Sequence, residues 1–105
     1  MPWFYLFIAG LLEIVWAYSM KQSEGFTRTI PTIITLIAML GSFWLLALAM
    51  RTIPLGTAYV IWTGIGAVGA FILGIILLSE PVNAARILAA LLIISGLILM
   101  KVSSA

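Results

Sequence analysis

Four long apolar runs alternate with three short polar segments along the chain. The runs cover about residues 3–20, 30–50, 57–78 and 84–100. Each run is near the roughly 20 residues that a helix needs to cross the hydrocarbon core of a bilayer. The polar segments contain prolines and two glycines, which interrupt helices, and most of the charged residues. The pattern predicts an all-α membrane protein with four transmembrane helices in a single domain over residues 1–105.

Two polar residues are expected to cap helices. Thr29 precedes Pro31, and proline is well tolerated in the first helical turn, so Thr29 is the expected N-cap of the second helix. Asn83 follows Pro81 and directly precedes the last apolar run, so it is the expected N-cap of the fourth helix.

The composition excludes most soluble and enzymatic classes. Of 105 residues, 65% are hydrophobic and only 8% are charged, which is more apolar surface than a soluble domain of this size can bury. The chain has no cysteine and no histidine, so thiol chemistry and the usual proton carrier near neutral pH are absent. With one buried acid besides, no nucleophile–base pair and no metal shell can be assembled. We therefore expect no enzyme, no metal and no cofactor.

The charges at the helix ends are almost balanced across the membrane. With four crossings, Arg51 and Lys101 lie on one side, and Lys21, Arg28 and Arg86 lie on the other. Because the lysine and arginine bias orients membrane proteins, such a chain can insert both ways and form an antiparallel homodimer; chance balance in a small protein is the equal alternative. The net charge of +2 lies beside lipid headgroups and requires no nucleic-acid partner.

Glu13 is the only charged residue of the first apolar run. A helix that begins near Trp3 places it about 15 Å deep, near the middle of the bilayer. A charge at that depth costs on the order of 3 kcal/mol, and no other helix offers a cation at similar depth. Either Glu13 is a neutral acid bonded to a neighbouring helix, or it binds protons and an external cation in competition, because burial disfavours an unpaired charge. Such competition is the minimal basis of proton-coupled antiport.

Two residues share the face of the helix that carries Glu13. Gly10, one turn earlier, leaves room, and Trp16, one turn later, has an indole N–H that can donate to a carboxylate. Ser42 of the second run lies near the same depth. Its hydroxyl group bonds either Glu13 or, as is commoner for a membrane serine, its own helix backbone.

The third run contains two aromatic residues and two glycines near its start. Tyr59 and Trp62 lie on one face, where they either stack on a flat cation or belong to the aromatic belt at the membrane surface. Gly64 and Gly66 weaken the helix and are the expected bend point.

The fourth run has little polar character at its centre. Ala89 and Gly96 are seven residues apart, and small residues at this spacing form close helix–helix contacts in membranes. We assign this face to dimerisation.

The segments "SEGFTR", "SFW" and "IPLGTAYVIWTGIGAVGA", together with the single Glu13, resemble the small multidrug resistance transporters over essentially the whole chain. Within that family, "EIVWA" and "WTGIGAVGA" resemble the guanidinium-exporter (SugE-like) branch, whereas the quaternary-ammonium branch typically has glycine in place of Trp16. The resemblance implies an antiparallel homodimer in a bacterial inner membrane. There the paired glutamates bind either protons or guanidinium, and alternating access exports the cation against proton entry.

The resemblance also implies roles for individual residues. Glu13 corresponds to the substrate carboxylate, Trp16 and Ser42 to its hydrogen-bond supports, and Tyr59 and Trp62 to the aromatic wall. Ala89 and Gly96 coincide with the family's dimer seam, although one of the two is often glycine elsewhere, so Ala89 departs from the pattern.

Two alternative functions remain open from the sequence. Guanidinium is flat and carries N–H donors that match a carboxylate, and Trp16 narrows the cleft, which favours guanidinium. Met39 and Phe43 of the second helix, however, can line a lateral opening for alkyl tails, as a broad quaternary-ammonium exporter requires. A non-transporting membrane scaffold is the third possibility, and it leaves Glu13 unexplained.

Overall fold

The computed structural model describes residues 2–103, and these residues form four helices joined by short connections. The helices are α1 (Pro2–Gln22), α2 (Thr29–Ala49), α3 (Leu55–Leu78) and α4 (Ala84–Ser103). All four are long and apolar enough to cross a membrane, as predicted from the four runs. The ends at Leu78 and Ala84 are as predicted, and the other ends differ by one to three residues, because polar residues such as Gln22 and Ser103 continue the backbone hydrogen bonding past the apolar runs.

The expected caps have opposite outcomes. Asn83 is confirmed, because its Oδ1 accepts a hydrogen bond from the Arg86 backbone N–H at 2.9 Å. The prediction for Thr29 is wrong: Thr29 is already helical, and Arg28 occupies the N-cap position without a side-chain cap. The connection is organised instead by buried Ser23, whose carbonyl oxygen accepts the N–H groups of Thr27 and Arg28. The helix therefore begins one residue earlier than a Thr29 cap would allow.

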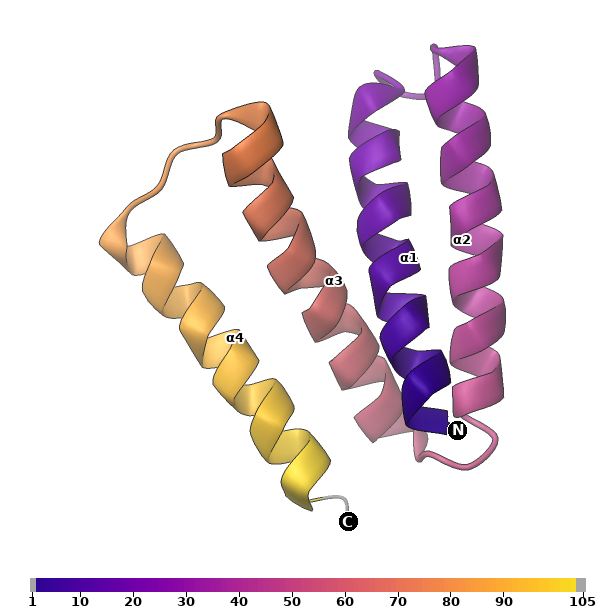
Figure 1. The fold of residues 1–105 in the computed structure, drawn as a ribbon, viewed down its shortest axis with the longest axis vertical. Coiled ribbons are helices and arrows are strands. Elements are labelled where there is room, and N and C mark those ends of the chain that lie inside the picture. The colour runs from indigo at the N-terminus through magenta and orange to yellow at the C-terminus, as the bar shows by residue number, and fades with distance from the viewer. Residues whose placement is uncertain (1, 104–105) are drawn as a thin grey trace.

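The four helices run alternately up and down and are spread out side by side (Figure 1). α1 lies between α2 and α3, while α4 packs against α3 alone among the helices. The described chain measures 42 × 35 × 16 Å, so its shortest dimension is little more than the roughly 10–12 Å diameter of one helix with side chains. A single chain is thus a thin layer that cannot surround a chamber.

The buried core lies where α1, α2 and α3 meet near the end that carries the N-terminus. It is formed by small and medium apolar side chains and one tryptophan. Its members are Leu6, Ala9, Leu46, Ala49, Ile53, Ala58, Ile61 and Trp62. By contrast, α4 has no buried residue in its described length, and its Leu97 side chain packs against Gly64 of α3.

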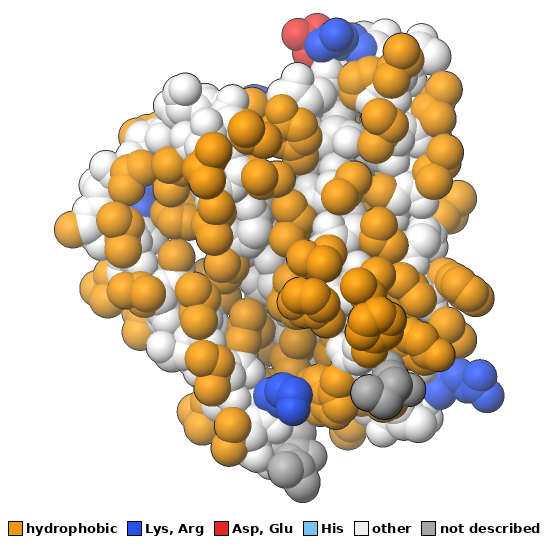
Figure 2. All heavy atoms as spheres, viewed as in Figure 1, with side chains coloured by type: hydrophobic (Ala, Val, Ile, Leu, Met, Phe, Trp, Pro, Cys, Tyr) orange, Lys and Arg blue, Asp and Glu red, His pale blue; other side chains and the backbone are white. Residues whose placement is uncertain are grey.

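Apolar side chains cover much of the surface shown in Figure 2, and the charged side chains visible in this view lie near the ends of the helices. Many large hydrophobic residues are exposed, Ile30, Leu40 and Leu99 among them. A soluble monomer rarely exposes contiguous apolar area on this scale. Lipid tails and further protein surface are the environments that suit this surface.

Candidate functional site

Glu13 lies near the midpoint of α1 and faces the midpoint of α3. Its side chain lies directly on Gly66: a Cβ atom at Gly66 would be 2.8 Å from Glu13 Cγ and closer still to the carboxyl group. Glycine is therefore required at position 66 if the carboxyl group is to stay where it is. The contact places the acid between two helices rather than among lipid tails.

Two buried polar atoms of this region have no hydrogen-bond partner among the described residues. They are Glu13 Oε1 and Trp16 Nε1, which belong to residues one helical turn apart. The hydrogen bond expected between them is not made. Unpaired buried polar atoms are rare in native proteins and call for a specific explanation, such as a missing ligand. One acceptor and one donor in the apolar part of α1 are thus left without a hydrogen-bond partner.

Glu13 also has no cation partner among residues 2–103. The ion pair of the described residues joins Arg86 to Glu80, 3.9 Å apart in the connection between α3 and α4 and the start of α4. No lysine or arginine of residues 2–103 forms such a pair with Glu13. These residues therefore supply no cation for the carboxylate.

Ser42 adopts neither of the two arrangements that the sequence left open. Its hydroxyl group donates to the Ala9 carbonyl oxygen at 2.7 Å and accepts from Trp62 Nε1 at 3.0 Å, with all three residues buried. In an α-helix the Ala9 carbonyl also accepts the N–H of the residue four positions later, which is Glu13. Ser42 therefore ties α2 and α3 to the turn of α1 that carries Glu13, without touching the carboxyl group.

Four aromatic rings form a continuous row across three helices. Trp16 of α1 packs edge-on against Phe43 of α2 with ring centroids 6.2 Å apart, and Phe43 packs against Trp62 of α3 at 5.9 Å. Tyr59 lies 5.7 Å from Trp62 and is 53% exposed. Tyr59 and Trp62, the two rings of the expected aromatic wall, are thus part of a longer row, in which Phe43 connects Trp16 to Trp62.

Gly10 and Met39 occupy different surroundings. Gly10 is buried, and a Cβ there would lie 2.6 Å from Ile65 Cγ2, so the space beside it is filled by α3. Met39 is half-buried on α2 and lies on the same face as Ser42 and Phe43, three and four residues before them. Its contribution to a lateral opening stays a prediction.

The two glycines that were expected to bend α3 lie within one continuous helix, Leu55–Leu78. Each of them receives a side chain from a neighbouring helix: Gly64 contacts Leu97 of α4, and Gly66 contacts Glu13 of α1. Their small size therefore serves close helix packing in this conformation, and a bend there stays a prediction.

Ala89 and Gly96 both lie on the exposed surface of α4. A Cβ atom added at Gly96 would have no neighbour within 4 Å. Both residues border grooves between α3 and α4, Ala89 beside Phe71 and Gly96 beside Tyr59. This face is open to a partner helix.

The comparison with known families decides the class of this molecule. The model of the family described as "Small Multidrug Resistance protein" matches residues 1–104. The chain belongs to this family. Together with the four apolar helices, the family assignment makes it a multi-pass transporter of the bacterial inner membrane.

Relatives with curated names are similar over their whole length. A protein of Yersinia pseudotuberculosis serotype I (strain IP32953), named "Guanidinium exporter", is 57% identical over 104 residues, covering 99% of this chain and 100% of the relative. Proteins of the same name from Citrobacter freundii and Salmonella typhimurium are each 56% identical over 104 residues, covering 99% of both chains. The transporter family and the resemblance stated from the motifs are thereby confirmed.

Sequence reasoning missed one element of the site, the carbonyl group of Ala9. A backbone carbonyl inside a helix already has a partner and gives no signal in the sequence. Only the side-by-side placement of α1 and α2 brings the Ser42 hydroxyl group to it. The site that results has one unpaired carboxylate oxygen, one unpaired indole N–H and a row of aromatic rings on one side.

Proposed function

We propose that two copies of this chain form an antiparallel homodimer that exports guanidinium in exchange for protons by alternating access. The observation that carries the proposal is that two buried atoms of α1, Glu13 Oε1 and Trp16 Nε1, have no hydrogen-bond partner in residues 2–103. The names of the full-length relatives support the choice of ion.

Guanidinium matches the chemistry of Glu13 and its surroundings. It is planar, carries N–H donors in a fork that fits a carboxylate, and is weakly hydrated. A planar cation can also stack on an aromatic face, and the row from Trp16 through Phe43 to Trp62 offers such faces next to α1. Trp16 donates but cannot accept, so in this proposal its indole N–H, which is unpaired in this structure, bonds and orients the Glu13 carboxylate when the cation is bound.

Ser42 supports the site indirectly in this proposal. It holds Trp62 through the indole N–H and holds the turn of α1 before Glu13 through the Ala9 carbonyl. A shift of α1 against α2 and α3 therefore changes both the carboxylate position and the aromatic wall. Tyr59 lies next to Trp62 at the exposed end of the row and, in this proposal, completes the aromatic wall there.

The exchange follows from competition for one carboxyl group. A proton and a guanidinium ion cannot both neutralise the same carboxylate, and an empty, charged carboxylate within the bilayer is unfavourable. The carrier therefore crosses between its two open states with one or the other bound. Inward movement of protons then drives outward movement of the cation.

The homodimer is supported by the shape of the chain. A layer 16 Å thick has no interior chamber, and α4 buries none of its described residues. A second copy supplies the missing half of a chamber and a partner for the face with Ala89 and Gly96. The near-balance of basic residues at the two ends permits the copies to have opposite orientations.

The test is a series of transport currents from proteoliposomes with guanidinium at several pH values. Wild type is expected to exchange guanidinium for protons. As the pH falls through the acidic range, its half-saturating guanidinium concentration is expected to rise by up to about tenfold per pH unit. Tenfold is the limit for one competing proton, because one pH unit corresponds to about 1.36 kcal/mol. Glu13→Gln cannot carry the charge and is expected to abolish exchange, while Glu24→Gln in the exposed connection after α1 is expected to transport normally.

Size-exclusion elution and tryptophan fluorescence show whether Glu13→Gln still inserts and folds. Retained pH-dependent exchange by Glu13→Gln would refute the shared site. Tetrapropylammonium is the second substrate, because the half-exposed Phe43 and Tyr59 side chains offer apolar area to alkyl groups. Currents with tetrapropylammonium and none with guanidinium would replace the proposal by a quaternary-ammonium exporter.

A further inference from the structure

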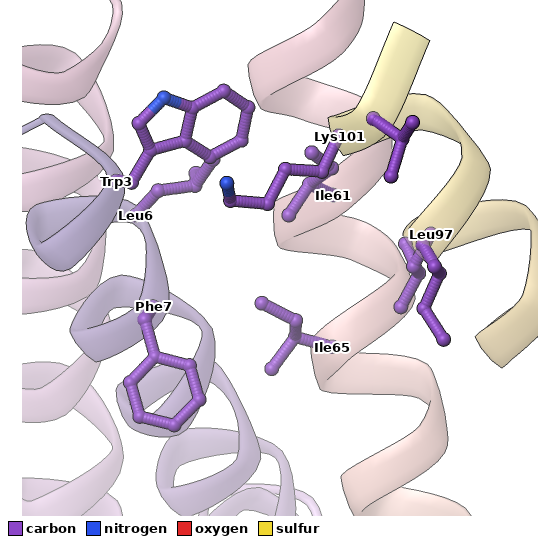
Figure 3. A pocket seen from close by; sticks show the side chains of 9 residues that line it. Trp3, Leu6, Phe7, Ile61, Ile65, Leu97 and Lys101 are labelled. Carbon is purple, nitrogen blue, oxygen red and sulfur yellow. The ribbon is translucent and has the colours of Figure 1, made fainter. Parts of the chain in front are cut away.

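A groove between α1, α3 and α4 lies outside the site described above. It has a volume of about 340 Å³, and its walls are almost entirely apolar. Figure 3 shows Phe7 of α1 on one side, Ile61 and Ile65 of α3 behind, and Leu97 of α4 opposite. The groove exists because α4 leans away from α1 and packs only against α3.

The upper rim of the groove in Figure 3 carries a cation. Lys101, in the last turn of α4, extends its amino group toward α1, where Nζ lies 4.8 Å from the centre of the Trp3 ring. The ammonium group is thereby held at the mouth of an apolar groove, near the end of the transmembrane helices. Long basic side chains reach the membrane surface in this manner while their stems cover apolar residues.

The positive charge at this end of the molecule is not compensated by acidic side chains. The three carboxylate side chains are Glu13 in the middle of α1, Glu24 after α1 and Glu80 after α3, so none lies at the end with Lys101. Arg51, between α2 and α3, adds a second positive charge at the same end. An anionic group at the mouth of the groove is therefore electrostatically favoured.

We infer that this groove binds an anionic phospholipid, with an acyl chain along Phe7, Ile65 and Ile98 and the phosphate group at Lys101. A bilayer lipid is the molecule that combines a long apolar tail with a negative headgroup at this depth, and anionic headgroups attract lysine near the membrane surface. The indole ring of Trp3 suits the same interfacial position.

The opposite face of α3 and α4 is the one available to a second copy. The contact between Gly64 and Leu97 separates two grooves: the first holds Ile98 and the residues of α1, and the second holds Gly96 and Tyr59. Because the proposed dimer seam follows Gly96, the groove with Lys101 faces away from it. The lipid site does not depend on which cation the protein carries.

The experiment measures lipid retention by native mass spectrometry on the full-length protein. Phosphatidylglycerol and phosphatidylcholine with identical acyl chains are the probes. Wild type is expected to retain phosphatidylglycerol about fivefold better than phosphatidylcholine, the ratio for one lysine at an anionic headgroup. Lys101→Gln is expected to remove this preference.

The matched control is Arg51→Gln, which removes the same charge from the same end of the molecule but lies outside the groove, beside Tyr5 and Leu48. It is expected to keep the preference. Ile98→Trp, which fills the groove and keeps Lys101, is expected to reduce retention of both lipids while the protein stays dimeric.

Three results would overturn the inference. The first is an unchanged preference in Lys101→Gln, and the second is an equal loss in Lys101→Gln and Arg51→Gln, which would indicate unspecific attraction. The third is conversion of Ile98→Trp to a monomer with unchanged lipid retention, which would show that a second copy covers the groove.

Discussion

Gly66 determines where the Glu13 carboxyl group can lie. The glycine offers backbone surface without a side chain, and the carboxyl group occupies the space that a Cβ atom would fill. Oε1 of that group is left without a hydrogen-bond partner among residues 2–103. The proposed cation site thus depends on a residue that makes no polar contact with the ligand.

We predict that Gly66→Ala displaces the carboxyl group and lowers guanidinium exchange. The new methyl group would clash with the Glu13 side chain, which is flexible enough to move away, so the fold is retained. Alanine also adds helix propensity of roughly 1 kcal/mol, which opposes unfolding. Transport currents and thermal unfolding in detergent, measured together, are expected to show reduced exchange without reduced stability.

Gly56→Ala is the matched control for this prediction. It makes the same substitution in α3, but nothing lies within 4 Å of the new Cβ atom. It is expected to transport like wild type. Equal transport by Gly66→Ala and Gly56→Ala would show that the contact between Gly66 and Glu13 has no functional role.

α4 has two faces with different surroundings, although its apolar sequence looks similar on both. One face borders the groove with Lys101, and the other carries Ala89 and Gly96. The helix makes close contact with α3 through Leu97 and Gly64, and it buries none of its described residues. A helix with so little internal packing is stabilised chiefly by lipid and by whatever covers its open face.

We predict that Gly96→Trp weakens the proposed homodimer. Small residues allow helix backbones to approach closely in membranes, and an indole group at position 96 would prevent this approach. The dissociation constant of the dimer is expected to rise at least about tenfold, equivalent to about 1.4 kcal/mol. Light scattering coupled to size-exclusion chromatography in detergent measures this change.

Leu91→Trp controls for the introduction of a bulky ring into α4. Leu91 is exposed and lies five residues before Gly96, which places it about 140° around the helix, toward the other face. It is expected to leave the dimer intact. Dissociation by Leu91→Trp and none by Gly96→Trp would show that the dimer seam lies on the face with Leu91 and not on the face with Gly96.

At the scale of the whole molecule, the basic residues are distributed almost evenly between the two ends of the helices, which bears on the orientation of the chain in the membrane. Three basic side chains (Lys21, Arg28 and Arg86) lie at one end of the helices, and two (Arg51 and Lys101) lie at the other. Orientation in the membrane follows the excess of lysine and arginine on the cytoplasmic side. An excess of one is a weak orienting signal, and the proposed antiparallel dimer requires that both orientations occur.

We predict that shifting this balance locks the orientation and stops transport until a complementary copy is present. Thr52→Lys, Ser103→Lys and Arg28→Gln together change the count to four against two, which directs both termini to the cytoplasm. Gln22→Lys with Val82→Lys changes it to two against five, which directs them outward. Fusion reporters at the C-terminus measure orientation, and guanidinium export from cells measures function.

Each locked form is expected to be inactive when expressed alone and active when the two are expressed together. Wild type is expected to give signal from both reporters. Full export by a single locked form would mean that the functional dimer is parallel, or that one chain suffices.

Individual predictions from the sequence and their outcomes show which features of the structure can be read from the hydropathy pattern and which cannot. The four spans and the cap at Asn83 depend on hydropathy and local chemistry, and the structure confirms them. Thr29 failed as a cap because buried Ser23, six residues earlier, organises the connection between α1 and α2. The partners of Ser42 were not predictable, because they depend on how α1 and α3 are rotated against α2.

The sequence by itself determined the number of helices, their lengths to within three residues and the position of Glu13 near the middle of the first one, because these follow from hydropathy and from the fixed rise of an α-helix. Only the tertiary structure decided that Gly66 receives the carboxyl group, that Ser42 bonds Ala9 and Trp62, and that Phe43 joins the aromatic row. These contacts depend on how each helix is rotated and tilted against its neighbours. Apolar sequence, which is similar all around such helices, does not specify that rotation.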